Sequence, residues 1–122
     1  MVTGKSRRTD AAVPTKATIR VADNLGISQK VLASVVGLSE PTVSRMRRGA
    51  YVLKPDSGKA FELALLLVQL GTLIERLVFQ DRDSAKAWMV AENTALHGQP
   101  IHLIQNAQGL VRVVSYLRYR LN

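Results

Sequence analysis

The stretch from Ser28 to Gly49, SQKVLASVVGLSEPTVSRMRRG, constrains the fold of this chain most strongly. Its apolar residues recur at helical spacing on both sides of Gly37, and glycine accepts the positive φ of a sharp turn. Ala33 is small enough to let two helices approach, and the branched Val43 is shaped to fill the gap between them. These residues predict two short helices packed at an angle, which is a helix-turn-helix.

The second helix of this pair is predicted to begin at about Glu40 and to end at Gly49. Ser39 stands at the N-cap position, where its hydroxyl can accept a hydrogen bond from the amide of Thr42. The face opposite the apolar residues carries short hydroxyls, a carboxylate and arginines, which can read base edges and bind phosphates in a major groove. The predicted DNA-binding residues are Ser39, Glu40, Thr42, Ser44, Arg45, Arg47 and Arg48.

A plain helical hairpin is the alternative interpretation, because this geometry also occurs as simple helix packing and an arginine pair is usually a solvated face. The glycine, the cap and the basic end are in register, which favours DNA binding over that alternative. From about Ile19 to Gly49 the pattern resembles the Xre and lambda-repressor family of helix-turn-helix domains.

Charge is divided unevenly along the 122 residues. Residues 1–54 hold ten Lys and Arg against three acids, whereas residues 55–122 hold seven against six, so most of the net charge of +8 lies in the first half. A phosphate-binding surface is therefore expected in the first half. The basic N-terminus lacks the apolar run of a signal peptide and no stretch is long enough to span a membrane, so we expect a soluble, cytoplasmic protein.

Three segments are expected. Residues 1–13 are predicted to be a flexible basic arm, residues 14–55 a helix-turn-helix DNA-binding domain, and residues 56–122 a helical domain for dimerisation and partner binding. Within the second segment, helical spacing predicts a first helix from about Thr15 to Leu25 that Gly26 ends.

The most apolar element is the predicted helix from about Ser57 to Phe79. A helix that is apolar on nearly every face has to be covered all round, which indicates self-association or a protein partner. Gly71 in its middle predicts a close crossing by another helix.

Shorter helices follow. Asp81 or Asp83 is expected to cap one, Pro100 to open a single turn, and Ala107 to begin a last helix with a core stripe. No alternating strand pattern occurs. The fold is therefore predicted to be all-α, with an N-terminal helix-turn-helix, a long apolar helix and a small C-terminal helical domain.

The run from Ala85 to Leu117 resembles the C-terminal domain of the Xre/MbcA/ParS family of antitoxins. The residues that carry the resemblance are Trp88, Asn93, Ala95, Leu96, Gly98, Pro100, Leu103, Ile104 and Gly109. The resemblance implies an antitoxin that silences a RES-domain toxin acting on NAD and that binds operator DNA of its own operon. As a DNA binder, the chain is expected to work as a homodimer on an inverted repeat. Some partners in that family transfer ADP-ribose instead of destroying NAD.

The signature residues are themselves expected to be scaffold: core side chains, turn formers and, at Gly109, a close packing site. The remaining polar and aromatic residues are the predicted toxin contacts, since interfaces favour Tyr and Arg. They are Gln99, His102, Gln105, Arg112, Tyr116, Arg118, Tyr119, Arg120 and Asn122. In the family the C-terminal end reaches toward the toxin's active site, so Arg118, Arg120 and the terminal carboxylate of Asn122 are hypothesised to block the NAD pocket.

Enzymatic function is not expected. His97 and His102 have no carboxylate at ligand spacing, the chain has no cysteine, and two aspartates before a helix are ordinarily caps, so neither a metal nor a cofactor is predicted. Two other functions stay open. One is a stand-alone transcription regulator whose C-terminal helices only dimerise, and the other is a toxin inhibitor that no longer reads DNA. A RES-type enzyme in the adjacent reading frame would support the antitoxin or the inhibitor, and its absence would favour the stand-alone regulator.

Overall fold

A computed structural model describes the backbone of residues 3–122 and the side chains of residues 12–122. Residues 1 and 2, the start of the predicted arm, lie outside the described part. Between residues 3 and 122 the chain forms helices and no strand. The one β-type backbone pairing in this part is an isolated bridge between Asn93 and Gly98. The elements in order are α1 (Thr3–Asn24), α2 (Gln29–Val36), α3 (Glu40–Arg47), the 3-10 turn η1 (Pro55–Ser57), α4 (Lys59–Leu77), α5 (Arg82–Val90), α6 (Pro100–Leu103) and α7 (Ala107–Leu121). The all-α prediction is confirmed.

Helix α1 is longer than the sequence predicted, because it begins at Thr3 and not near Thr15. Most of the segment expected as an arm therefore has a helical backbone. Pro14 lies inside the helix, where its missing N–H removes one backbone hydrogen bond. The hydroxyl of Thr18 donates to the Pro14 carbonyl at 2.7 Å, one turn further on.

The helix-turn-helix formed by α2 and α3 agrees closely with its prediction. Gly37 has φ +71°, and its N–H donates to the Ala33 carbonyl at 2.9 Å, which closes α2. Ser39 is the N-cap of α3 and accepts from the Thr42 amide at 3.2 Å. Gly49 follows the last turn with φ +78°.

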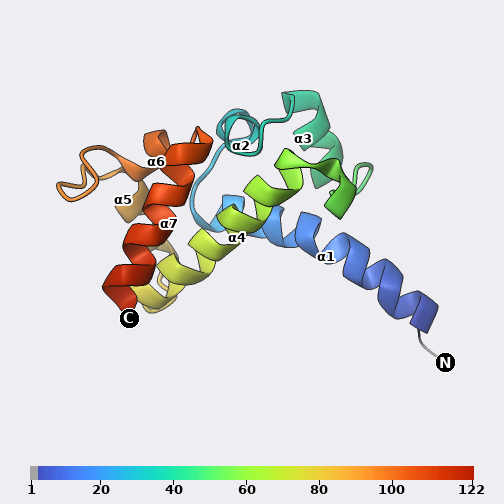
Figure 1. Ribbon diagram of the computed structural model, residues 1–122, viewed down its shortest axis with the longest axis horizontal. Coiled ribbons are helices and arrows are strands. Elements are labelled where there is room, and N and C mark those ends of the chain that lie inside the picture. The colour runs from blue at the N-terminus through green and yellow to red at the C-terminus, as the bar shows by residue number, and fades with distance from the viewer. Residues whose placement is uncertain (1–2) are drawn as a thin grey trace.

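Helix α4 is the central element, and α1, α2 and α7 all pack against it (Figure 1). Its Gly71 lies under Val21 of α1, so that a Cβ at this position would come within 2.7 Å of both Val21 methyl groups. The predicted close crossing is therefore confirmed. Because the chain's own helices cover most of α4, its apolar surface does not by itself require a second copy; Leu65 is the large apolar side chain of α4 left exposed, at 41%.

The ends of α4 differ from the prediction of a helix from about Ser57 to Phe79. Gly58 has φ +70° and ψ −131°, a conformation that separates η1 from α4, so the helix begins at Lys59. It ends at Leu77, because Phe79 and Gln80 both take positive φ and turn the chain toward Asp81, the N-cap of α5. No glycine marks this second turn in the sequence.

One continuous core joins the two halves of the chain. Leu32 and Val36 of α2 belong to the same buried cluster as Leu67 of α4 and Leu110 and Leu117 of α7. The predicted core stripe of α7 consists of Leu110, Val113, Val114, Leu117 and Leu121. The first four are buried, and Leu121 is half-buried. The surface of α3 and the surface of α7 are thus presented by a single packed body.

Candidate functional site

The exposed face of α3 carries the arginines that the sequence singled out. Val43 and Met46 turn inward and are buried, which leaves Arg45 and Arg48 on the exposed side. Nη2 of Arg45 donates a hydrogen bond to Oγ1 of Thr42 at 3.0 Å, and Nη1 of Arg48 donates one to Oγ of Ser44 at 2.8 Å. Both guanidinium groups are accessible to a phosphate or a base edge and are partly oriented by neighbouring hydroxyls.

The N-terminal turn of α3 adds a small hydroxyl network to this face. Oγ of Ser39 and Oγ1 of Thr42 lie 2.9 Å apart and share a hydrogen bond. Glu40 in the first turn is exposed, whereas Ser44 is half-buried. Short polar side chains at the start of a helix, followed by arginines one turn on, are the groups that helix-turn-helix proteins place against base edges and phosphates.

Arg47 behaves differently from the other two arginines. Its Nη1 lies 3.0 Å and 3.3 Å from the two carboxylate oxygens of Asp23, so it ties α3 to the end of α1. Both side chains are exposed, and such a pair contributes little stability. A DNA contact from Arg47 stays a prediction, and it would have to compete with this ion pair.

The predicted toxin-contact residues before α7 lie around the short helix α6. Gln99 precedes the helix, His102 is exposed within it, and Gln105 follows it with its Nε2 donating to the Ile101 carbonyl at 3.2 Å. In α7, Arg112 donates from Nη2 to the carbonyl oxygen of Leu96 at 2.6 Å. Arg112 therefore also holds the loop between α5 and α6 in place.

The last turns of α7 bring together the remaining predicted contacts. Nη2 of Arg118 donates to Oε1 of Gln69 on α4 at 2.6 Å, and Nη1 of Arg120 donates to the Tyr116 hydroxyl at 2.9 Å. Tyr119 is 88% exposed. Asn122 is exposed directly after the helix. This end of α7 displays aromatic and cationic groups to solvent, as a protein interface requires.

Several signature residues of the C-terminal segment hold its fold together. Oδ1 of Asn93 accepts from the Leu96 amide at 3.0 Å, and Leu96 is buried. A Cβ added at Gly109 would overlap the carbonyl oxygen of Leu103, so α6 and α7 can meet only if residue 109 is glycine. Trp88 is half-buried against the core.

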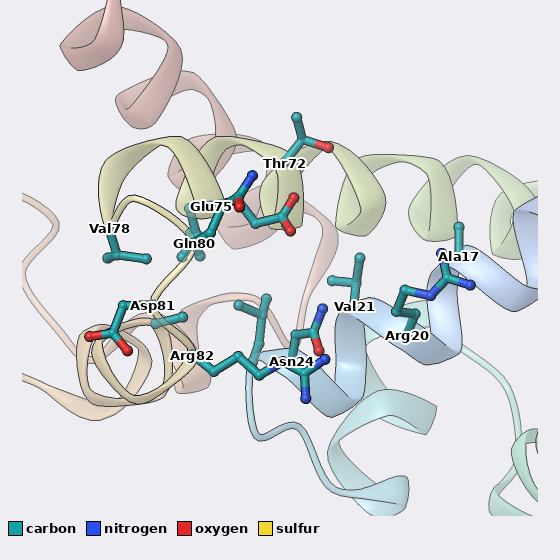
Figure 2. A pocket seen from close by; sticks show the side chains of 14 residues that line it. Ala17, Arg20, Val21, Asn24, Thr72, Glu75, Val78, Gln80, Asp81 and Arg82 are labelled. Carbon is teal, nitrogen blue, oxygen red and sulfur yellow. The ribbon is translucent and has the colours of Figure 1, made fainter.

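A polar hollow of about 440 Å³ between α1, α4 and α5 was not predicted from the sequence. Figure 2 shows Glu75 reaching into it from α4 and Arg82 extending from α5 toward α1, where Arg20 also lines the wall. Its charges have both signs, and its lining comes from three distant segments, so no local motif could have signalled it. A second hollow of about 420 Å³ lies beside Trp88, Tyr116 and Arg120.

The residues that the structure describes contain no group of three His, Asp or Glu side chains placed to hold a metal ion. In the same part of the chain, no helix is both long and apolar enough to span a membrane.

Comparison with protein families supplies two matches. Residues 5–69, more than half of the chain, match the model of the antitoxin Xre-like helix-turn-helix domain. Residues 76–120 match the model of the antitoxin Xre/MbcA/ParS C-terminal toxin-binding domain. The first match runs beyond the expected domain boundary at residue 55 and takes in more than half of α4. A search of curated proteins found no significant match.

Proposed function

This chain belongs to the Xre-like antitoxins, and from that membership we propose that it neutralises a RES-domain toxin acting on NAD and represses its own operon. It is a DNA-binding antitoxin, with a helix-turn-helix in its first half and a toxin-binding domain in its second. The identity of the toxin is proposed from the resemblance of the Ala85 to Leu117 segment to antitoxins of RES-domain partners. We propose that the protein acts in the cytoplasm.

Operator binding is assigned to the exposed face of α3. The observation that supports it is the outward position of Arg45 and Arg48, each oriented by a hydroxyl of its own helix. We propose that a homodimer binds an inverted repeat, with half-sites about one helical turn apart, because a single α3 helix reads only one half-site. The proposed DNA contacts are Ser39, Glu40, Thr42, Ser44, Arg45, Arg47 and Arg48.

Toxin neutralisation is assigned to α6 and α7. The exposed end of α7, with Tyr119, Arg120 and Asn122, supports a surface that reaches into a partner. We propose that Arg118, Arg120 and Asn122 cover the toxin's NAD pocket. The other proposed toxin contacts are Gln99, His102, Gln105, Arg112, Tyr116 and Tyr119.

Co-expression with the adjacent gene tests the proposal. The adjacent gene should encode a RES-domain enzyme that lowers cellular NAD and arrests growth, and this chain should restore both and co-purify with the enzyme. An unaltered NAD pool with protein-bound ADP-ribose would identify the transferase version of the toxin. Absence of any growth effect or complex would contradict the toxin proposal.

The DNA half of the proposal is tested separately with the promoter-proximal fragment of the same operon. Binding should weaken steeply as salt rises, because phosphate contacts release counterions. A salt-insensitive affinity would contradict the assignment of α3 to DNA. This measurement needs no toxin, so the two halves of the proposal can fail independently.

A further inference from the structure

The corner between α4 and α5 holds the side chain of Phe79 in solvent. Phe79 is 91% exposed, more than any other large apolar side chain among residues 12–122. Its φ is +54°, a conformation that L-residues other than glycine, asparagine and aspartate rarely adopt, and Gln80 follows with φ +64°. The corner therefore carries two unfavourable features at one residue: an exposed aromatic ring and a strained backbone.

Backbone hydrogen bonds hold this conformation in place. The N–H of Gln80 donates to the Glu75 carbonyl at 2.9 Å, and the N–H of Asp81 donates to the Val78 carbonyl at 3.1 Å. Asp81 then serves as the N-cap of α5. Because the direction of the Phe79 side chain is set by this turn, and the ring has few rotors of its own, burying it against a partner would freeze little further motion.

The corner lies at the same end of the molecule as the C-terminus (Figure 1). Nη2 of Arg76, in the last turn of α4, donates to the Leu121 carbonyl at 3.4 Å, which places the end of α4 against the end of α7. Tyr119, in the last turn of α7, is 88% exposed. The two most exposed large apolar or aromatic side chains of the described part, Phe79 and Tyr119, thus come from the ends of two adjoining helices.

We propose that Phe79 is an anchor residue for the toxin, bound together with the end of α7. The partner would offer an apolar pocket for the ring of Phe79 and acidic groups for the guanidinium groups of Arg118 and Arg120. This inference rests on the proposed function for the identity of the partner. Its own support is that residue 79, like residue 119, lies inside the segment 76–120 that matches a toxin-binding domain, and that strained backbone and exposed aromatics are characteristic of binding sites.

The test compares Phe79→Gly with the unsubstituted chain. Glycine removes the ring and accepts the positive φ without strain, so the melting temperature should hold or rise while the affinity for the purified RES-domain toxin falls by roughly tenfold or more. Affinity for operator DNA should not change. Phe79→Tyr should retain most of the toxin affinity, and Leu65→Ala, which truncates an exposed apolar side chain on α4, should retain all of it.

A Phe79→Gly variant that binds the toxin within about twofold of the unsubstituted chain would overturn the inference. So would a lower melting temperature with unchanged toxin affinity, which would assign Phe79 to the fold. A switch from dimer to monomer in sedimentation, again with unchanged toxin affinity, would assign the ring to a second copy of this chain. Failure of the unsubstituted chain to bind the toxin would instead overturn the proposed function, and this inference with it.

Discussion

Single residues on α3 connect the sequence pattern to DNA recognition. Thr42 and Ser44 each accept a hydrogen bond from an arginine one turn further along the helix, at 3.0 Å and 2.8 Å. These bonds reduce the number of conformations that Arg45 and Arg48 would lose on meeting a duplex. These hydroxyl groups can therefore assist DNA binding by orienting the arginines, even where they do not contact a base.

Alanine at Arg45 or Arg48 should weaken operator binding by about 1–3 kcal/mol each. Lysine at the same positions should recover part of the loss at a phosphate contact and little at a bidentate base contact, because the flexible ammonium lacks the planar fork of arginine. Mobility shift at fixed salt measures both effects. Lys86→Ala, an exposed cation of α5, is the matched control and should leave the affinity unchanged; equal losses at all three positions would mean that only net charge matters.

Gly109 lies where an added side chain would meet the backbone of the preceding turn. A methyl group there would overlap the Leu103 carbonyl, which belongs to backbone and cannot swing aside. We expect Gly109→Ala to lower the free energy of unfolding by about 2–3 kcal/mol and to impair toxin binding through the fold. Denaturant unfolding measures this. Ser115→Ala, exposed on α7, should have little effect, and a Gly109→Ala variant of unchanged stability would refute the close contact.

Contacts between helices determine how the elements are arranged, and the contact between α1 and α4 is an example. At Gly71 a Cβ would lie 2.7 Å from both methyl groups of Val21, so the two helices cross with a glycine under a branched side chain. The sequence indicated this contact because glycine in the middle of an apolar helix is costly unless something crosses there.

Gly71→Ala should destabilise the protein by about 1–3 kcal/mol, because the added methyl overpacks the crossing. Combining it with Val21→Ala should recover part of that loss, since removing the branched methyls makes room. A double-mutant cycle in urea measures the coupling. Strictly additive effects would show that the two residues do not meet.

Several element boundaries followed the sequence where a glycine, proline or capping residue marked them, although the starts of α1 and α4 did not. Gly37, Ser39 and Pro100 each stand where the pattern placed a turn, a cap or a helix start. The sequence placed a helix break between Phe79 and Asp81, but the positive φ of Phe79 and Gln80 was not predicted, because neither residue type signals it. Among the candidate site residues, the outward face of α3 follows from helical spacing alone. The Arg47 to Asp23 and Arg112 to Leu96 contacts could not be predicted, since they depend on how distant elements pack.

Across the whole molecule, the surface proposed to bind DNA and the surface proposed to bind the toxin lie on different helices, although one core supports both. The first half of the sequence carries most of the net positive charge. The proposed toxin contacts on α7 lie at the end of the second half, which is close to neutral. Variants at one surface should therefore leave the other intact unless they damage the core.

Deleting residues 118–122 is the sharpest whole-molecule test. The deletion removes the Arg118 bond to Gln69 and the exposed Tyr119 but leaves the buried Leu117. Growth rescue should be lost while operator affinity in a mobility shift stays within about twofold. The matched variant Arg45→Ala should show the opposite pattern. Retained neutralisation by the truncated chain would contradict the proposal that the last turn of α7 covers the toxin's NAD pocket.

The central position of α4 affects how the protein would be degraded in a cell. Because the buried side chains of both halves meet on it, neither half is left with an intact core once it melts. If the proposed function holds, a protease that captures the opened chain would free the toxin and end the proposed repression of the gene in the same event. The rate at which α4 unfolds would then determine when both events occur.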